Sequence, residues 1–194
     1  MGRRIPRQSR GTKNLKTRYV IFTEVLVTER QYLELLRQHL RPRHATFSIK
    51  PIGKDPSRVF TEYLKAEQRG DFDRAILVVD VDQHHKLDEV LRDCGSSTSV
   101  DAIVTNPCFE LWLLWHAANR RGYTETRECV RLARINNLTG DKDLNTKFPI
   151  ASFPEAVKRA QQAWSGLAPN KKGPNPSSAM PWLIDLMTST HHNS

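Results

Sequence analysis

Acidic residues follow two of the apolar segments that the sequence predicts as β-strands. Glu24 comes directly after residues 18–23, and Asp80 and Asp82 follow the continuous apolar run at residues 75–79. Ligands of open parallel sheets bind beyond the carboxyl ends of the strands, so we expect the three carboxylates to converge there. Carboxylates held this close repel one another unless a cation lies between them, and Mg²⁺ prefers oxygen ligands. The sequence therefore predicts a site for Mg²⁺, or for Mn²⁺ in its place, formed by these acids.

A D-x-D pattern after an apolar strand is compatible with several activities and also with an acidic turn that caps the next helix. A Walker-type ATPase would need a G-x-x-x-x-G-K-[ST] phosphate loop, which the chain lacks, so ATP hydrolysis is disfavoured. Haloacid-type phosphatases normally carry D-x-D on their first strand, whereas here it follows the third. Glycosyltransferases that use D-x-D are usually longer chains. Chemistry alone excludes neither of these two classes, and a phosphatase of small phosphoesters stays open.

Four further residues could assist such a site, and each also has a purely structural interpretation. Glu110 lies in the first turn of a helix that is otherwise apolar, where it either interacts with the helix N-terminus or faces a cleft. His84 and His85 could bind a metal or move protons, or they form a surface pair at the start of a helix. Lys142 lies in a polar loop, from which it could reach a phosphate or remain solvated.

The positive charge of the chain is concentrated at its start. The 194 residues include 30 Lys and Arg against 21 Asp and Glu, a formal net charge of +9. Residues 1–18 contain no acid and carry seven of the basic residues: Arg3, Arg4, Arg7, Arg10, Lys13, Lys16 and Arg18. We expect a flexible basic arm, either one that gathers nucleic-acid phosphates with strong salt dependence or a solvated tail without a specific partner.

The sequence indicates a cytoplasmic protein with no membrane segment. No stretch reaches the roughly 20 apolar residues that a membrane span needs, and the arginine-rich start lacks the apolar region of a secretory signal. Cys94, Cys108 and Cys129 are widely spaced, odd in number and without a C-x-x-C pattern. We therefore expect free thiols in a reducing compartment and no structural zinc site.

Strands and helices are predicted to alternate along the first half of the chain. The predicted strands are residues 18–23, 46–52, 75–79 and 100–104. Predicted helices run from Thr28 to near Pro42, from Asp55-Pro56 to Gly70, around 88–91, from Asn106-Pro107 onward, over 125–135 and 154–167, and around 182–187. Thr28, Asp55 and Asn106 are expected to cap their helices, with proline in the first turn after the last two.

This order of elements predicts an α/β protein. Alternation up to about residue 105, followed by helices alone, favours a parallel sheet sandwiched by helices with an α-helical C-terminal extension. The predicted boundaries are a basic arm at 1–17, an α/β core at 18–120 and a helical extension at 121–194. A chain of this length can bury one substantial hydrophobic core.

Residues 105–114, TNPCFELWLL, resemble the S-N-P-C-F-E-L-W-L-L signature of RloB-like proteins, a Toprim-type family of bacterial phage-defence and restriction-associated proteins. Three shorter segments are also similar to the family. Thr23-Glu24 with Thr28-Glu29 and Tyr32 resembles its C-E-G-E-K-T-E-P-x-Y start, residues 78–82 resemble its V-F-D-x-D segment, and residues 173–178 its N-P-S region. The resemblance extends over about residues 18–187.

The resemblance implies a Toprim-like α/β core and a metal-dependent nuclease. In that family pattern Glu24 would act as general acid or base, while Asp80 and Asp82 would hold Mg²⁺ against a scissile phosphate of DNA or RNA, tRNA included. Family members are commonly encoded beside an ABC- or SMC-like ATPase that acts as a sensor, so such an ATPase is the expected partner. A chain without a phosphate loop of its own fits this arrangement.

The chain departs from the family directly after Glu24. Val25, Leu26 and Val27 stand where the family has Gly, Glu and Lys. Glycine allows a sharp turn close to a phosphate, whereas β-branched Val25 does not readily take a positive φ, and the missing lysine removes a positive charge. Two hypotheses follow: an Mg²⁺-dependent Toprim-type endonuclease of an antiphage system, or a catalytically silent Toprim subunit that binds an ATPase or nucleic acid.

Overall fold

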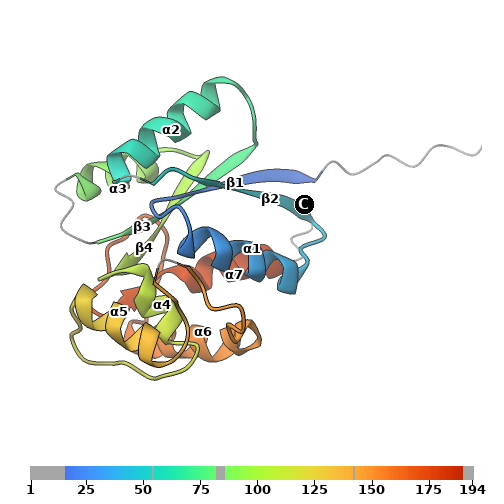
Figure 1. Ribbon diagram of the computed structural model, residues 1–194. Coiled ribbons are helices and arrows are strands. Elements are labelled where there is room, and N and C mark those ends of the chain that lie inside the picture. The colour runs from blue at the N-terminus through green and yellow to red at the C-terminus, as the bar shows by residue number, and fades with distance from the viewer. Residues whose placement is uncertain (1–15, 54, 82–85, 142, 190–194) are drawn as a thin grey trace, which may run out of the picture.

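The protein is built on one five-stranded sheet with the strand order β2-β1-β3-β4-β5 (Figure 1). The computed structural model describes residues 16–53, 55–81, 86–141 and 143–189. The first four strands are parallel, and the short β5 pairs with β4 in the antiparallel sense. The strands are β1 (Thr17–Thr23), β2 (Ala45–Pro51), β3 (Arg74–Asp80), β4 (Val100–Asn106) and β5 (Ser177–Ser178).

Helices cover both faces of this sheet, which confirms the predicted α/β class. One face is covered by α2 (Pro56–Gln68) and α3 (Leu87–Ser96), the other by α1 (Thr28–Leu40) together with the C-terminal helices (Figure 1). The C-terminal helices are α4 (Phe109–Leu114), α5 (Thr126–Ile135), a 3-10 turn (Ile150–Ser152), α6 (Phe153–Ala163) and α7 (Met180–Thr188). Among the described residues, no helix is long and apolar enough to cross a bilayer.

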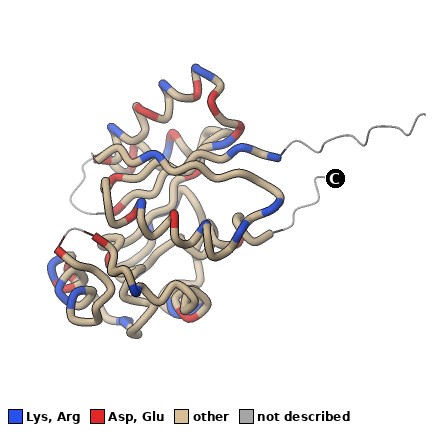
Figure 2. Tube along the Cα trace, turned by 45° about the vertical axis from the view of Figure 1, so that its right-hand side comes forward, with Lys and Arg blue, Asp and Glu red and all other residues tan. Residues whose placement is uncertain are grey.

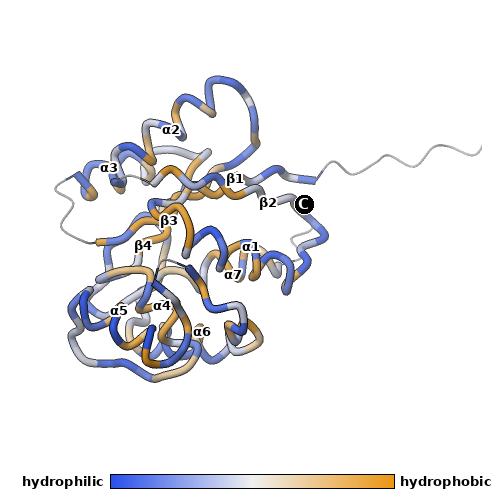
Figure 3. The backbone as a smooth tube through the Cα atoms, in the orientation of Figure 1, coloured by the Kyte–Doolittle hydropathy of each residue, from blue (hydrophilic) through white to orange (hydrophobic). Residues whose placement is uncertain are grey.

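The central strand β3 contributes to both hydrophobic cores. Ile76 and Val78 pack into the core beneath α1, while Ala75, Leu77 and Val79 pack into the core beneath α2 and α3. Successive side chains of a strand point to opposite faces, so a strand that is covered on both sides reads as a continuous apolar run. The most apolar part of the backbone accordingly lies in the middle of the sheet (Figure 3).

The predicted cap at Asp55 is confirmed, whereas those at Thr28 and Asn106 are wrong. Asp55 Oδ1 accepts hydrogen bonds from the backbone N–H groups of Ser57 and Arg58, at 3.1 and 3.3 Å. Thr28 is itself the first residue of α1, with Val27 at the cap position. Asn106 is the last residue of β4, and the helix after it begins only at Phe109.

Contacts with distant parts of the chain explain the error at Asn106. Its side-chain Nδ2 donates to the carbonyl of Gly173 at 2.9 Å, and its backbone pairs with Ser177 of β5. The expectation of helices alone after residue 105 is thereby corrected as well, because β5 extends the sheet. The three cysteines are buried and form no disulfide, as expected.

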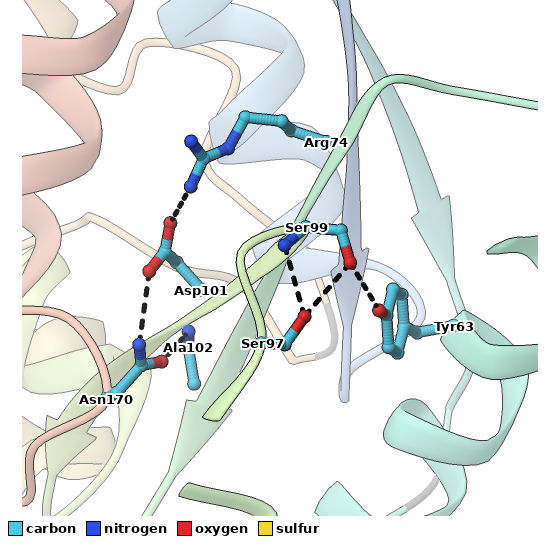
Figure 4. Close-up of polar contacts among 7 residues, drawn as sticks. All are labelled: Tyr63, Arg74, Ser97, Ser99, Asp101, Ala102 and Asn170. Atoms are coloured by element: carbon cyan, nitrogen blue, oxygen red, sulfur yellow. Dashed lines mark hydrogen bonds and ion pairs between the residues drawn. The ribbon is translucent and has the colours of Figure 1, made fainter. Parts of the chain in front are cut away.

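A loop after α6 covers the edge of β4 near its beginning. The backbone N–H of Asn170 donates to the carbonyl of Ala102 at 2.8 Å, and Asn170 Oδ1 accepts from the Ala102 N–H at 2.6 Å. Asn170 Nδ2 also reaches Asp101, which forms an ion pair with Arg74 (Figure 4). Asn170 therefore replaces a neighbouring strand at this position, with its amide acting as a second backbone group.

Candidate active site

The carboxyl edge of the sheet, formed by the C-terminal ends of β1–β4, brings Glu24 and Asp80 into contact. β1 and β3 are neighbours, so the residue after β1 lies beside the last residue of β3. The backbone N–H of Asp80 donates to Glu24 Oε2 at 2.6 Å, and the N–H of Phe109 donates to Asp80 Oδ2 at 3.1 Å. Both acids are nearly buried, with 8% of Glu24 and 9% of Asp80 exposed.

A third acid, Glu29 in the first turn of α1, lies in the same buried region. Its side chain is fully buried, and its Oε2 accepts a hydrogen bond from the Val25 N–H at 3.0 Å. Its Oε1 atom and the Oδ1 atom of Asp80 are buried without a hydrogen-bond partner among the described residues. A buried carboxylate oxygen without a partner is costly, so these two oxygens are acceptors that the described residues do not satisfy.

Burial and mutual repulsion raise the pKa of two of these acids. Loss of water raises the pKa of Asp80 well above its usual value, and the negative charges of Glu29, Glu24 and Glu110 raise it further. Burial is also the main reason why the pKa of Glu29 is raised, with Glu24 and Glu110 adding to it. Within the described ranges, no lysine or arginine forms an ion pair with Glu29 or Asp80.

Glu110 contributes to this cluster from the first turn of α4. It is half-buried, and its charge is one of the causes that raise the pKa of both Asp80 and Glu29. The neighbouring Phe109 supplies the N–H that holds Asp80, so the start of α4 both orients one acid and provides another. We define the acidic cluster as Glu24, Glu29, Asp80 and Glu110.

The acidic cluster suits a divalent cation by the chemistry of its donors, but the described residues do not complete a metal site. Carboxylate oxygens are the ligands of Mg²⁺, and the unsatisfied Oδ1 of Asp80 is one such donor. Among the described residues, no group of three or more His, Cys, Asp or Glu side chains is arranged to hold a metal ion. Asp82, which is expected to complete the set, lies outside those residues.

The segment Val25–Leu26–Val27 forms an exposed bend between β1 and α1. β1 ends at Thr23, so these three apolar residues do not prolong the strand. The exposed fractions of the three residues are 40%, 54% and 38%. The backbone is nevertheless held in place, because Thr23 Oγ1 donates to the Val25 carbonyl at 3.0 Å and Gln31 N–H to the Val27 carbonyl at 2.9 Å.

A buried aromatic cluster lies behind the acids, around His116. His116 Nε2 is 3.3 Å from the Tyr32 hydroxyl, and its Nδ1 is 3.2 Å from the Trp112 carbonyl. The rings of Tyr32, Trp112 and Phe148 pack against the imidazole edge to face. Burial lowers the pKa of His116 to about 4, so the imidazole is neutral at pH 7 and serves packing.

Of the other residues predicted for the site, only Lys16 lies within the described residues. Lys16 is exposed and lies just before β1, at the opposite end of that strand from Glu24, about 26 Å away along the chain. The remaining ones lie outside the described residues: Asp82, His84, His85, Lys142, Arg3, Arg4, Arg7, Arg10 and Lys13.

Glu29 was not among the predicted site residues, although the sequence contains a signal for it. The apolar positions Tyr32, Leu33 and Leu36 of α1 are buried, and Glu29 precedes them at helical spacing on the same face. A carboxylate on the buried face of a helix needs a hydrogen-bond partner or a cation, which is the mark of a functional position. The family's C-E-G-E-K-T-E-P-x-Y start, quoted above, also includes this glutamate.

The chain belongs to the RloB-like protein family, whose pattern matches residues 19–187. This range contains the whole acidic cluster and both layers of helices. Neither the curated proteins nor the solved structures contain a match to the chain. The assignment to the family therefore depends on the sequence, and the arrangement of the acids is known from the structure alone.

Proposed function

We propose that this protein is an Mg²⁺-dependent nuclease of the Toprim type, the effector of an antiphage defence system that acts in the cytoplasm. The contact between Glu24 and Asp80 at the carboxyl edge, with Glu29 buried beside it, is the observation that supports the proposal most strongly. Asp80 and Glu29 are buried and form no ion pair with a described lysine or arginine, which reduces stability, and a divalent cation with a bound phosphate would account for their retention. Membership of the RloB-like family supports the same class of activity.

In this proposal Asp80, Asp82 and Glu24 hold the cation, and each also has a task of its own. A bound Mg²⁺ polarises the scissile phosphate and stabilises the leaving oxyanion. Glu24 transfers a proton as general acid or base, the role that the family pattern implies for this position. The Phe109 N–H keeps one oxygen of Asp80 occupied and thereby aims the other, Oδ1, into the cluster.

Glu29 serves as a positioning residue in the same proposal. Its hydrogen bond to the Val25 N–H fixes the backbone directly after Glu24. The family's glycine is absent there, so the bend is shaped by this bond and by Thr23 rather than by a residue with a free backbone. The charge of the missing lysine would have to come from elsewhere on the substrate-facing surface.

Cleavage by the full chain tests this function directly. Supercoiled DNA, single-stranded RNA and tRNA are incubated with Mg²⁺ or Mn²⁺, and products are resolved on denaturing gels. We expect cleavage of at least one substrate, reduced at least about 100-fold in Asp80→Asn and Glu24→Gln, which corresponds to roughly 2.7 kcal/mol of lost transition-state stabilisation. Asp73→Asn, at the other end of β3, is the matched control and should cleave within about twofold of the wild type. Cleavage that survives Asp80→Asn would refute the assignment.

A catalytically silent subunit is the second candidate, and the exposed Val25–Leu26–Val27 bend favours it. Three adjacent apolar side chains on a fixed backbone suit a contact with a partner such as an ABC- or SMC-like ATPase. The candidates differ in cells that carry the complete defence system. If phage protection is unchanged in Asp80→Asn but lost in Leu26→Asp, the silent subunit is correct; loss of protection in Asp80→Asn supports the nuclease.

A further inference from the structure

A surface hollow of about 280 Å³ opens beside the acidic cluster, between the end of β2 and α2. Pro51, Ile52, Arg58 and Glu62 line it. The backbone N–H of Ile52 donates to the carbonyl of Thr23 at 3.0 Å, which places the floor of the hollow next to the residue before Glu24. The hollow and the acidic cluster therefore lie at the same edge of the sheet, one strand apart.

Leu26 stands next to this hollow and is held there by the shape of Gly53. Gly53 has a φ of +72°, and a Cβ atom at this position would lie 2.6 Å from the Cδ2 atom of Leu26. Only glycine allows both this backbone conformation and this close approach. The side chain of Leu26 thus has a fixed seat against the backbone of Gly53, yet 54% of the residue stays exposed to solvent.

The lining combines three kinds of chemistry. Pro51 and Ile52 offer apolar surface, to which Leu26 adds from beside the hollow through its approach to Gly53. Arg58 offers an exposed guanidinium that forms no hydrogen bond or ion pair with another described side chain. Glu62 is held by Lys65 at 2.7 Å and remains an ionised acceptor, because that hydrogen bond lowers its pKa. An apolar wall, a cation and an acceptor are the groups that a nucleotide requires for its base face, its phosphate and its exocyclic amino group.

We propose that this hollow binds one unstacked nucleotide of the substrate, next to the phosphate that the acidic cluster cleaves. The base lies against Leu26 and Ile52, the phosphate faces Arg58, and an amino group of the base donates to Glu62. This inference rests on the proposed nuclease function and narrows its substrate to single-stranded or locally unpaired nucleic acid. A base in an intact duplex stays stacked and would have to be turned out before it could enter.

The test measures binding rather than cleavage. The probes are a fluorescein-labelled single strand of about 12 nucleotides, as DNA and as RNA, and the blunt duplex of the same sequence, titrated with full-length Asp80→Asn protein and followed by anisotropy. We expect the single strand, as DNA or as RNA, to bind more tightly than the duplex. Adding Leu26→Ser or Arg58→Gln should weaken single-strand binding about tenfold and reduce the preference over the duplex.

Two matched controls separate the hollow from general surface effects. Leu64→Ser is the control for Leu26 and changes an exposed leucine that lies on α2. Arg69→Gln is the control for Arg58 and removes an arginine about three turns from it, at the end of the same helix. Both should bind the single strand as tightly as the Asp80→Asn parent protein. The melting temperature of every variant should stay within about 2 °C of that parent. Equal effects of the paired substitutions, or equal affinity for single strand and duplex, would overturn the inference.

The binding experiment tests the nucleotide site whether or not the protein cleaves nucleic acid. If no metal and no substrate gives cleavage but Leu26→Ser and Arg58→Gln still weaken single-strand binding, the nuclease function fails and the nucleotide site stands. If cleavage depends on Asp80 while these two substitutions leave single-strand binding unchanged, the nucleotide site fails alone. Loss of binding to a purified ATPase partner in Leu26→Ser, with single-strand binding intact, would assign this surface to a protein instead.

Discussion

Strand β3 has an aspartate at each end, and the two have opposite electrostatic environments. Asp73, just before the strand, is exposed and accepts hydrogen bonds from the backbone N–H of Arg18 at 2.8 Å and from its guanidinium at 2.9 Å. These bonds hold the pKa of Asp73 below its usual value. Asp80, the last residue of the strand, is buried beside other acids, and its pKa is raised. The two aspartates are only seven positions apart, yet one is neutralised and the other lacks a cationic partner among the described residues.

The same contrast holds between the two edges of the sheet. At the amino edge, Asp101 is paired with Arg74 at 2.9 Å and also accepts from Asn170 (Figure 4). Lysine and arginine are spread over both layers of helices and over the loops, so the chain does not lack cations (Figure 2). At the carboxyl edge, by contrast, no described lysine or arginine forms an ion pair with Asp80 or Glu29. Proteins commonly accept such a local loss of stability at sites that act on a ligand.

The largest effect that follows from this contrast is a gain of stability on removal of one buried charge. Without metal, Asp80→Asn should raise the free energy of unfolding by a few kcal/mol and the melting temperature by about 5–10 °C, because a buried, repelled carboxylate becomes neutral. Asp73→Asn, which removes an exposed pair, should change the melting temperature little and in the downward direction. Calorimetry in a chelating buffer measures both, and a lower melting temperature for Asp80→Asn would contradict the account.

The pH dependence of stability should show the same acids. The pKa values of Asp80 and Glu29 are higher in the folded state than in the unfolded chain. Between the two values the folded state binds more protons, so the free energy of unfolding falls as the pH rises above about 4. We expect this decline in the metal-free wild type and a weaker one in Asp80→Asn. Urea unfolding between about pH 5 and 8 measures it, and parallel curves for the two proteins would argue against a buried charge.

His116 makes a smaller contribution of opposite sign to the pH dependence of the free energy of unfolding. Its pKa is lowered from 6.5 to about 4, so the unfolded state binds more protons between these values and stability is lost as the pH falls through them. The shift corresponds to about 3 kcal/mol at most. An NMR titration of the imidazole carbons should give a midpoint near 4 in both wild type and Asp80→Asn. A midpoint above 6 would show that His116 is not enclosed by its aromatic neighbours.

A smaller change in stability is expected at the amino edge, where Asp101 already has an ion pair and a hydrogen bond. Asn170→Ala removes the bond to the Ala102 N–H and the bond to Asp101, and it places alanine at a φ of +60°. We expect a loss of about 2 kcal/mol in the free energy of unfolding. Asn170→Gly keeps the backbone conformation without strain and should lose less than the alanine variant. If both variants unfold like the wild type, Asn170 does not hold the edge of β4.

Local sequence patterns were sufficient for the four parallel strands and for the placement of two acids at one edge. Apolar runs of strand length identified β1, β3 and β4, and the rule for parallel sheets placed Glu24 and Asp80 together. Asp55 was predictable because its cap uses residues two and three positions away. Glu29 was predictable in principle from the helical spacing of its apolar neighbours.

The remaining features depend on contacts that a local pattern does not contain. Asn106 shares the Asx-Pro pattern of Asp55, but its amide binds Gly173, a residue 67 positions later, and its backbone continues β4. The two-residue β5 carries no strand signal of its own and exists because β4 offers it a partner. Asn170 likewise shows its role only once the edge of β4 is in place. Such tertiary hydrogen bonds decide between conformations that the local sequence permits equally.

A calorimetric titration of the metal-free protein with Mn²⁺ tests most directly whether the acidic cluster at the carboxyl edge binds a divalent cation. The account predicts saturable binding to the wild type together with a rise in melting temperature. Both should be lost in Asp80→Asn and retained in Asp73→Asn. Absence of binding to the wild type, or equal binding to wild type and Asp80→Asn, would contradict it.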